Sequence, residues 1–120
     1  GNDTHVDYGV YATPRLNLHS IWDGLLAERA ISAPPQLIRT YPAAERRRES
    51  AGDVNAWSQE NWAIAKRAYA AAMGGDPCQP TPAHMTMNED AIRAMAPVER
   101  EQVKRGGLRL AKLLDSAFRG

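Results

Sequence analysis

A histidine and an aspartate stand four positions apart in the segment NLHSIWD, residues 17–23. If this segment is helical, His19 and Asp23 project from the same side of the helix on successive turns. Imidazole nitrogen and carboxylate oxygen are both zinc ligands, and an i, i+4 pair can hold one ion. The same spacing also suits a plain surface hydrogen bond, and on spacing alone that interpretation is favoured.

Two ligands do not complete a zinc site, because a catalytic zinc normally has three protein ligands and a water. The remaining histidines are His5, in a predicted loop, and His84, after a proline-rich loop. We expect both to be solvent-exposed. The single cysteine, Cys78, cannot form an internal disulfide and is expected to be unpaired. The residues of this chain therefore predict only part of a metal site.

The pattern of apolar residues predicts an all-α fold, a helical bundle that positions this pair. Helices are expected at about 18–30, 54–73, 88–95 and 98–118, with Asn17, Asp53 and Asn88 as N-caps. Short helical turns are expected within 36–41 and 42–49. Residues 1–16 should be an extended loop or hairpin-like excursion, and residues 74–87 a loop. Pro97 is expected to separate the last two helices.

The last helix should bury one stripe, formed by Val103, Gly107, Leu110, Leu114 and Ala117. Gly106 and Gly107 cost roughly 1 kcal/mol each inside a helix. Close approach of a neighbouring helix would explain their presence.

Composition excludes some classes of protein. A chain of 120 residues suits one domain, and its net charge of 15 − 14 = +1 predicts no strong attraction to nucleic acid or to an anionic membrane. No apolar run is long enough to span a membrane, so no membrane partner is expected. The first residues, GNDTHVDYG, contain no signal peptide, and such a start suits a processed chain or a fragment.

Four segments together resemble one family. They are GN at 1–2, NLHSIWD at 17–23, AWSQEN at 56–61 and QVKRGGLRLAKLLDSAF at 102–118. In order and approximate spacing they are similar to the C-terminal half of the zinc-dependent single-strand nucleases of the S-one/P-one type, which are also 3′-nucleotidases. The motif Asn-Leu-His-x-x-Trp-Asp is the most specific of them.

The resemblance implies an α-helical fold related to zinc-dependent phospholipase C, with three clustered zinc ions. His19 and Asp23 would bind one ion, and Asn2 would help to hold a nucleotide. The other zinc ligands and the general-base aspartate would lie upstream, so no catalytic residue is assigned within this chain. Residues 1–120 would be the C-terminal portion of one nuclease domain, and the missing N-terminal half would be its partner.

The activity implied for the complete enzyme is hydrolysis of phosphodiester bonds in single-stranded DNA and RNA, and of 3′-phosphates of nucleotides, by metal-activated water. The isolated chain is expected to have little or no activity. Family members are secreted or periplasmic. The family pattern Trp-Ala-x-Glu-Ser is replaced by WSQEN at 57–61, in which Glu60 is retained for a structural polar contact.

Two alternatives remain open. A zinc phospholipase C would share the metal chemistry but cleave lipid head groups; Trp22 and the initial Gly-Asn favour the nuclease. A non-catalytic helical module would instead bind a partner through its apolar faces, and would be stably folded and monomeric without zinc.

Overall fold

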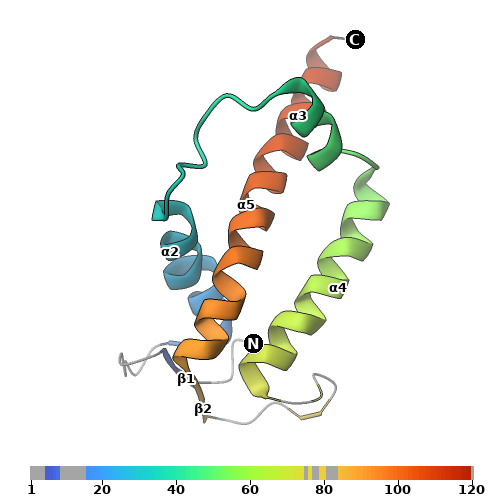
Figure 1. Cartoon of the computed structure of the whole chain (residues 1–120). Helices are drawn as coiled ribbons and strands as arrows, with labels where there is room; N and C mark the ends of the chain where they lie inside the picture. Colours follow the sequence, from blue (N-terminus) through green and yellow to red (C-terminus); the bar gives the residue numbers. More distant parts are fainter. Residues whose placement is uncertain (1–4, 9–15, 75, 77–78, 81–83, 120) are drawn as a thin grey trace.

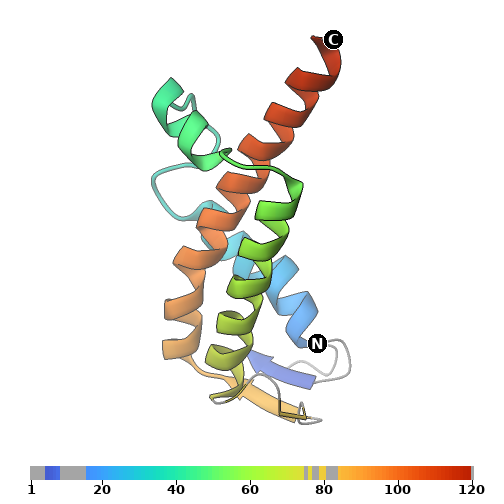
Figure 2. The ribbon, with the colours of Figure 1, turned by 90° about the vertical axis from the view of Figure 1, so that its right-hand side faces the viewer.

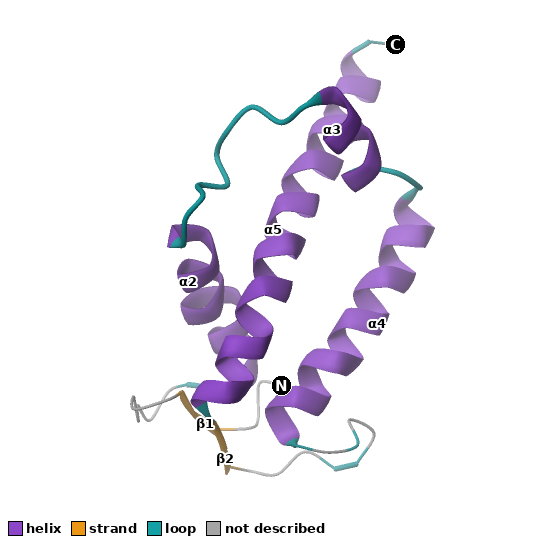
Figure 3. Cartoon of the chain, viewed as in Figure 1, coloured by secondary structure: helices purple, strands orange, loops and turns teal. Residues whose placement is uncertain are grey.

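The computed structural model describes residues 5–8, 16–74, 76, 79–80 and 84–119. Its elements in chain order are β1 (His5–Tyr8), α1 (Leu18–Ser20), the π-helix η1 (Ile21–Leu26), α2 (Ala27–Ser32), α3 (Ala43–Glu49), α4 (Val54–Met73), β2 (His84–Met87) and α5 (Glu89–Phe118). Helices dominate the described part of the chain (Figure 3), which confirms the predicted all-α class.

The predicted first helix is confirmed, but its middle is wound differently. α1, η1 and α2 follow one another without a break. Asn17 caps the start: its side chain accepts a hydrogen bond from the backbone of Ser20 at 2.8 Å, and Ser20 Oγ accepts one from the Asn17 backbone at 3.0 Å. Residues 21–26 are π-helical, a rare i→i+5 winding often found at functional sites.

The predicted helix at 54–73 is confirmed at both ends. Asp53 accepts a hydrogen bond from the Ala56 backbone at 2.9 Å, and Gly74 ends the helix with φ of 70°. Glycine adopts this left-handed conformation without strain. α4 runs beside the long helix α5, and α2 packs on another side of α5 (Figures 1 and 2).

The predicted break at Pro97 is wrong. α5 begins after the Asn88 cap and continues through Pro97 as one helix of 30 residues. Ile92 and Met95 are buried before the proline and Glu99 after it, so packing on both sides offsets the missing hydrogen bond. The turn expected within 36–41 is also absent, whereas the one after Pro42 forms α3.

Two segments predicted as loops instead contain paired strands. β1 and β2 form a parallel sheet in which His5 lies opposite His84 and Val6 opposite Met85. The sheet closes one end of the molecule (Figure 2). Val6 is fully buried and its backbone donates to Leu16 O at 2.9 Å. This bond ties β1 to the residues just before the first helix.

The core lies where the sheet, the first helix, α4 and the start of α5 meet. It contains Val6, Leu18, Ile21, Leu26, Ala72, Met87, Ile92 and Met95. The radius of gyration is 16.2 Å, larger than the ~13.6 Å of a compact chain of this length. The far ends of α4 and α5 thus extend beyond this core.

The buried stripe predicted on the last helix is wrong. Leu110 and Leu114 are 56% and 47% exposed, and Gly107 and Ala117 are exposed as well. No heavy atom lies within 4 Å of a Cβ built on Gly106 or Gly107, counting the described residues outside the local helix backbone. Close helix approach therefore does not explain these glycines. Among the described residues no helix has the length and apolar character of a membrane span.

Candidate metal and substrate cleft

A cleft of about 840 Å³ opens between the first helix, α4 and α5. Its lining combines apolar, aromatic and polar side chains, as ligand sites commonly do. The lining residues are Leu18, His19, Trp22, Asp23, Trp57, Asn61, Ile64, Ala65, Ala68, Tyr69, Met87, Met95, Gln102, Gly106, Arg109, Leu110 and Leu113.

The predicted ligand pair lies at this cleft. His19 Nε2 and Asp23 Oδ2 are 2.9 Å apart, and their side chains are 61% and 62% exposed. Two donors that share a zinc at 2.0–2.2 Å lie about 3.3 Å apart in a tetrahedral site, so this pair fits two positions around one ion after a small side-chain movement. The structure thus brings the two predicted ligand groups together.

The π-helical winding begins between the two predicted ligands and includes Asp23. Leu18 and Ile21 are buried, and Trp22 is half-buried at the cleft. Because η1 begins at Ile21, Trp22 and Asp23 belong to the wider winding whereas His19 belongs to the regular turn before it. The sequence offered no clear signal for this segment beyond Gly24 in the helix interior.

Three aromatic side chains, Trp22, Trp57 and Tyr69, form an aromatic wall of the cleft, and Trp57 is fixed by contacts with its neighbours. Trp57 is 8% exposed, and its indole N–H donates to Ala51 O at 2.7 Å. The Arg109 guanidinium lies 5.2 Å from the Trp57 ring centroid, a cation–π contact. Together with Trp22 and Tyr69, Trp57 gives the cleft aromatic surface from the first helix and from α4.

A buried carboxyl group, Glu99 of α5, was missed by the sequence analysis. Glu99 is 6% exposed, and its Oε2 has no hydrogen-bond partner among the described residues. Burial, and secondarily the charge of Asp23, raises the pKa of Glu99 to about 7. Glu99 is therefore a second carboxyl group that interacts electrostatically with Asp23, and its charge changes with pH near neutrality.

Two glutamates, Glu49 of α3 and Glu60 of α4, are paired with arginines of α5. Glu60 accepts hydrogen bonds from Arg105 at 2.6 Å and from Arg109, and Glu49 accepts from Arg105 at 3.0 Å. Burial raises the pKa of Glu49, but hydrogen bonds from Arg105 and Arg48 outweigh it and lower the pKa to about 2. The structural contact predicted for Glu60 is thus confirmed.

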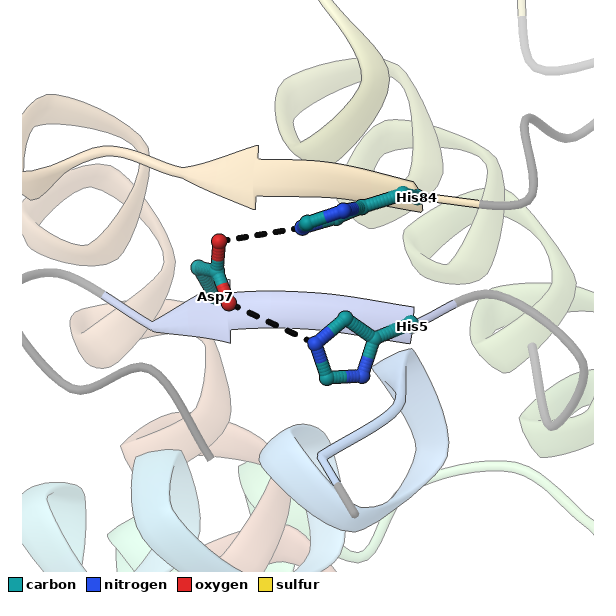
Figure 4. Close-up of side chains that lie close together, drawn as sticks. All are labelled: His5, Asp7 and His84. Carbon is teal, nitrogen blue, oxygen red and sulfur yellow. Dashed lines mark hydrogen bonds and ion pairs between the residues drawn. The ribbon is translucent and has the colours of Figure 1, made fainter. Parts of the chain in front are cut away.

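The two histidines outside the predicted pair, His5 and His84, lie together with an aspartate. His5 Nε2 is 3.4 Å from Asp7 Oδ1, and His84 Nε2 is 3.0 Å from Asp7 Oδ2 (Figure 4). Donor atoms of the three residues lie within 4.8 Å of one another, close enough for one metal ion. The expected solvent exposure is confirmed for His84, which is 56% exposed, and is wrong for His5, which is half-buried at 33%. The contacts of both histidines with Asp7 depend on a strand pairing that sequence spacing does not reveal. Asn2 and Cys78 lie outside the described residues.

Comparison with known proteins places these features in one family. The model of the S1/P1 nuclease family matches residues 1–119. This is the family that the sequence resembles, and its members are metal-dependent hydrolases that act on phosphodiester bonds of nucleic acids. No match was found among curated proteins or solved structures. The match extends over nearly the whole chain, and the protein therefore belongs to the S1/P1 nuclease family.

Proposed function

We propose that the chain forms part of a zinc-dependent nuclease that hydrolyses single-stranded DNA and RNA and the 3′-phosphates of nucleotides. His19 and Asp23 are two ligands of one zinc ion. The observation that carries the proposal is the position of this pair, at the edge of a cleft walled by Trp22, Trp57 and Tyr69.

The residues of this chain bind and orient rather than take protons. His19 Nε2 and Asp23 Oδ2 already face each other at 2.9 Å, so both donors are directed to the same point in space. Zinc bound there would supply Lewis acidity, which activates water and neutralises charge on phosphate oxygens. The capping box at Asn17 and Ser20 fixes the start of the helix that carries His19.

The aromatic wall supports a preference for single strands. An unpaired base can stack on an aromatic ring, whereas a base inside a duplex is already stacked on its neighbours. Trp22 and Tyr69 suit this role because both side chains are half-buried at the cleft, whereas Trp57 is only 8% exposed and is held in the wall by its hydrogen bond to Ala51. Asn2, from the Gly-Asn start, would add a contact to the nucleotide.

In this proposal, the remaining zinc ligands and the general base come from a part of the protein outside these 120 residues. Glu99 lies near the pair, but among the described residues no group of three possible metal ligands includes His19 and Asp23. Exposed leucines along α5, such as Leu110 and Leu113, support a surface that other parts of the domain cover. The chain on its own should therefore hydrolyse neither DNA nor nucleotides.

The test compares His19→Ala with Glu28→Gln, a change at an exposed carboxylate on the same helix and outside the cleft. In the protein that also contains the remaining ligands, His19→Ala should lower hydrolysis of single-stranded DNA and release of 3′-phosphate by about 1000-fold. This estimate exceeds the 10–100-fold loss of metal affinity or activity that follows when only a residue hydrogen-bonded to a metal ligand is changed. Glu28→Gln should keep both activities.

Three other results would count against the proposal. Cleavage of phosphatidylcholine without cleavage of DNA would assign a phospholipase C activity instead. Full activity of the 120-residue chain alone would show that its ligand set is complete. A stable, monomeric, zinc-free chain without activity in any assembly would support the interaction module.

A further inference from the structure

We propose that His5, Asp7 and His84 form a metal-binding site for a divalent transition-metal ion such as zinc, on the outer face of the β1–β2 sheet. The site does not depend on the nuclease function proposed above, and neither His19 nor Asp23 belongs to this group. It would join two strands whose ligands, Asp7 and His84, are 77 positions apart in the chain.

The strand geometry places all three ligands on one face. Side chains alternate between the two faces of a strand, so His5 and Asp7 share the face opposite that of Val6. Val6 is fully buried in the core, which directs His5 and Asp7 outward. His84 lies opposite His5 in the parallel register and therefore projects from the same face (Figure 4).

The donor atoms converge as a metal site requires. Both Nε2 atoms point to the Asp7 carboxylate, His5 to Oδ1 at 3.4 Å and His84 to Oδ2 at 3.0 Å. The two imidazole rings lie edge to face with centroids 4.7 Å apart. Donors around a tetrahedral zinc are about 3.3 Å apart, so small rotations of the side chains suffice to enclose an ion.

The partners of Asp7 distinguish this group from an ordinary surface salt bridge. In the part of the chain that the structure describes, no Lys or Arg pairs with Asp7; its carboxylate meets only the two imidazoles. The Asp7 side chain is 25% exposed and His5 33%, whereas His84 is 56% exposed. The site is thus partly enclosed and keeps an accessible side for an incoming ion and for water as a further ligand.

The ligand types select the metal. Two imidazoles and one carboxylate suit Zn²⁺ and its transition-metal neighbours, whereas Mg²⁺ and Ca²⁺ prefer sets made of oxygen ligands alone. Because Val6 donates to Leu16 O, next to the Asn17 cap, an ion that locks β1 to β2 would also steady the start of the helix that carries His19.

The experiment isolates this site by removing the other pair. In a His19→Ala/Asp23→Ala background, the purified protein is titrated with ZnCl₂ and the bound zinc is counted by native mass spectrometry. We expect one equivalent to remain. Adding His84→Ala, or separately the near-isosteric Asp7→Asn, should weaken zinc binding by about 100-fold or more, because losing a residue that is only hydrogen-bonded to a metal ligand already costs 10–100-fold.

Thr86→Ala is the matched control, because Thr86 lies on the same face of β2 and offers no metal-type ligand. The Thr86→Ala variant should still bind one zinc ion per chain. Circular dichroism of each variant shows whether it is folded, and Asp7→Asn keeps the test valid if His84→Ala unfolds. Loss of all zinc with the His19/Asp23 pair, or equal binding by Asp7→Asn and Thr86→Ala, would overturn the proposal.

Discussion

Carboxylates occur in two contrasting settings in this molecule. In the ionic cluster formed by Glu49, Glu60, Arg105 and Arg109, each glutamate accepts hydrogen bonds from guanidinium groups. At the cleft, Asp23 instead faces an imidazole, and more than half of its side chain is exposed. The same functional group, a carboxylate, is present in both settings, but the side chain that pairs with it and the extent of its burial differ.

The difference decides what each carboxylate can do. A guanidinium is permanently charged and occupies the lone pairs of its partner, so Glu60 is held as a structural anion whose pKa is lowered. A neutral imidazole is itself a metal ligand, and it adds no positive charge that would repel a cation from the carboxylate beside it. Ligand chemistry thus depends less on the presence of an acid than on whether an arginine has already neutralised it.

The strongest test of this contrast converts one setting into the other. His19→Arg should give Asp23 the kind of partner that Glu60 has, and zinc affinity at the cleft should fall by about 1000-fold as one ligand is lost and the other is neutralised. Stability should change by less than about 0.5 kcal/mol, since an exposed i, i+4 pair is worth little. Isothermal titration with zinc and denaturant unfolding measure the two effects. Unchanged zinc affinity would show that the pair is only a surface hydrogen bond.

The ionic cluster should be the more sensitive region in stability. Glu60→Gln leaves Arg105 and Arg109 without their shared anion, and Arg109 is only 10% exposed. We expect a loss of about 2–3 kcal/mol in the free energy of unfolding, because an arginine is left buried and unpaired. Asp115→Asn, which removes an exposed pair with Arg119, should cost less than about 0.5 kcal/mol. Equal effects of the two changes would remove the distinction between the regions.

Lowering the pH should reduce the stabilisation that the ionic cluster gives to the folded protein. The pKa of Glu49 is lowered from 4.5 to about 2 in the folded protein, so the folded state favours the charged form. This contribution is present above pH 4.5 and is lost as pH falls toward 2, a change on the order of 2 kcal/mol. Urea unfolding between pH 6 and pH 2.5 should show this loss, and Glu49→Gln should show a smaller dependence on pH. A parallel dependence in both proteins would assign the acid sensitivity to other groups.

Local features of the fold could be predicted from sequence. Asn17, Asp53 and Asn88 begin helices because each offers a side-chain acceptor to a free backbone N–H group, and all three caps are confirmed. The His19–Asp23 juxtaposition is likewise a consequence of helical spacing. The motif and its order along the chain also led to the correct family.

Features that depend on distant parts of the chain could not be predicted in this way. The pairing of β1 with β2 joins segments separated by most of the chain, so His5 and His84 seemed to have no partner. Pro97 was expected to break a helix, but packing around it keeps α5 continuous. Burial along α5 was inferred from spacing alone, although only contacts with other elements decide it.

The glycines of α5 provide the finest test, that of the exposed face of this helix. A methyl group added at Gly107 meets no heavy atom within 4 Å among the described residues. Gly107→Ala should therefore raise the free energy of unfolding of the chain by about 1 kcal/mol through backbone entropy alone. The reverse change at an exposed position of the same helix, Ala111→Gly, should lower it by a similar amount. If Gly107→Ala instead destabilises the larger nuclease proposed above while it stabilises the chain alone, another part of that protein must pack against this face of α5.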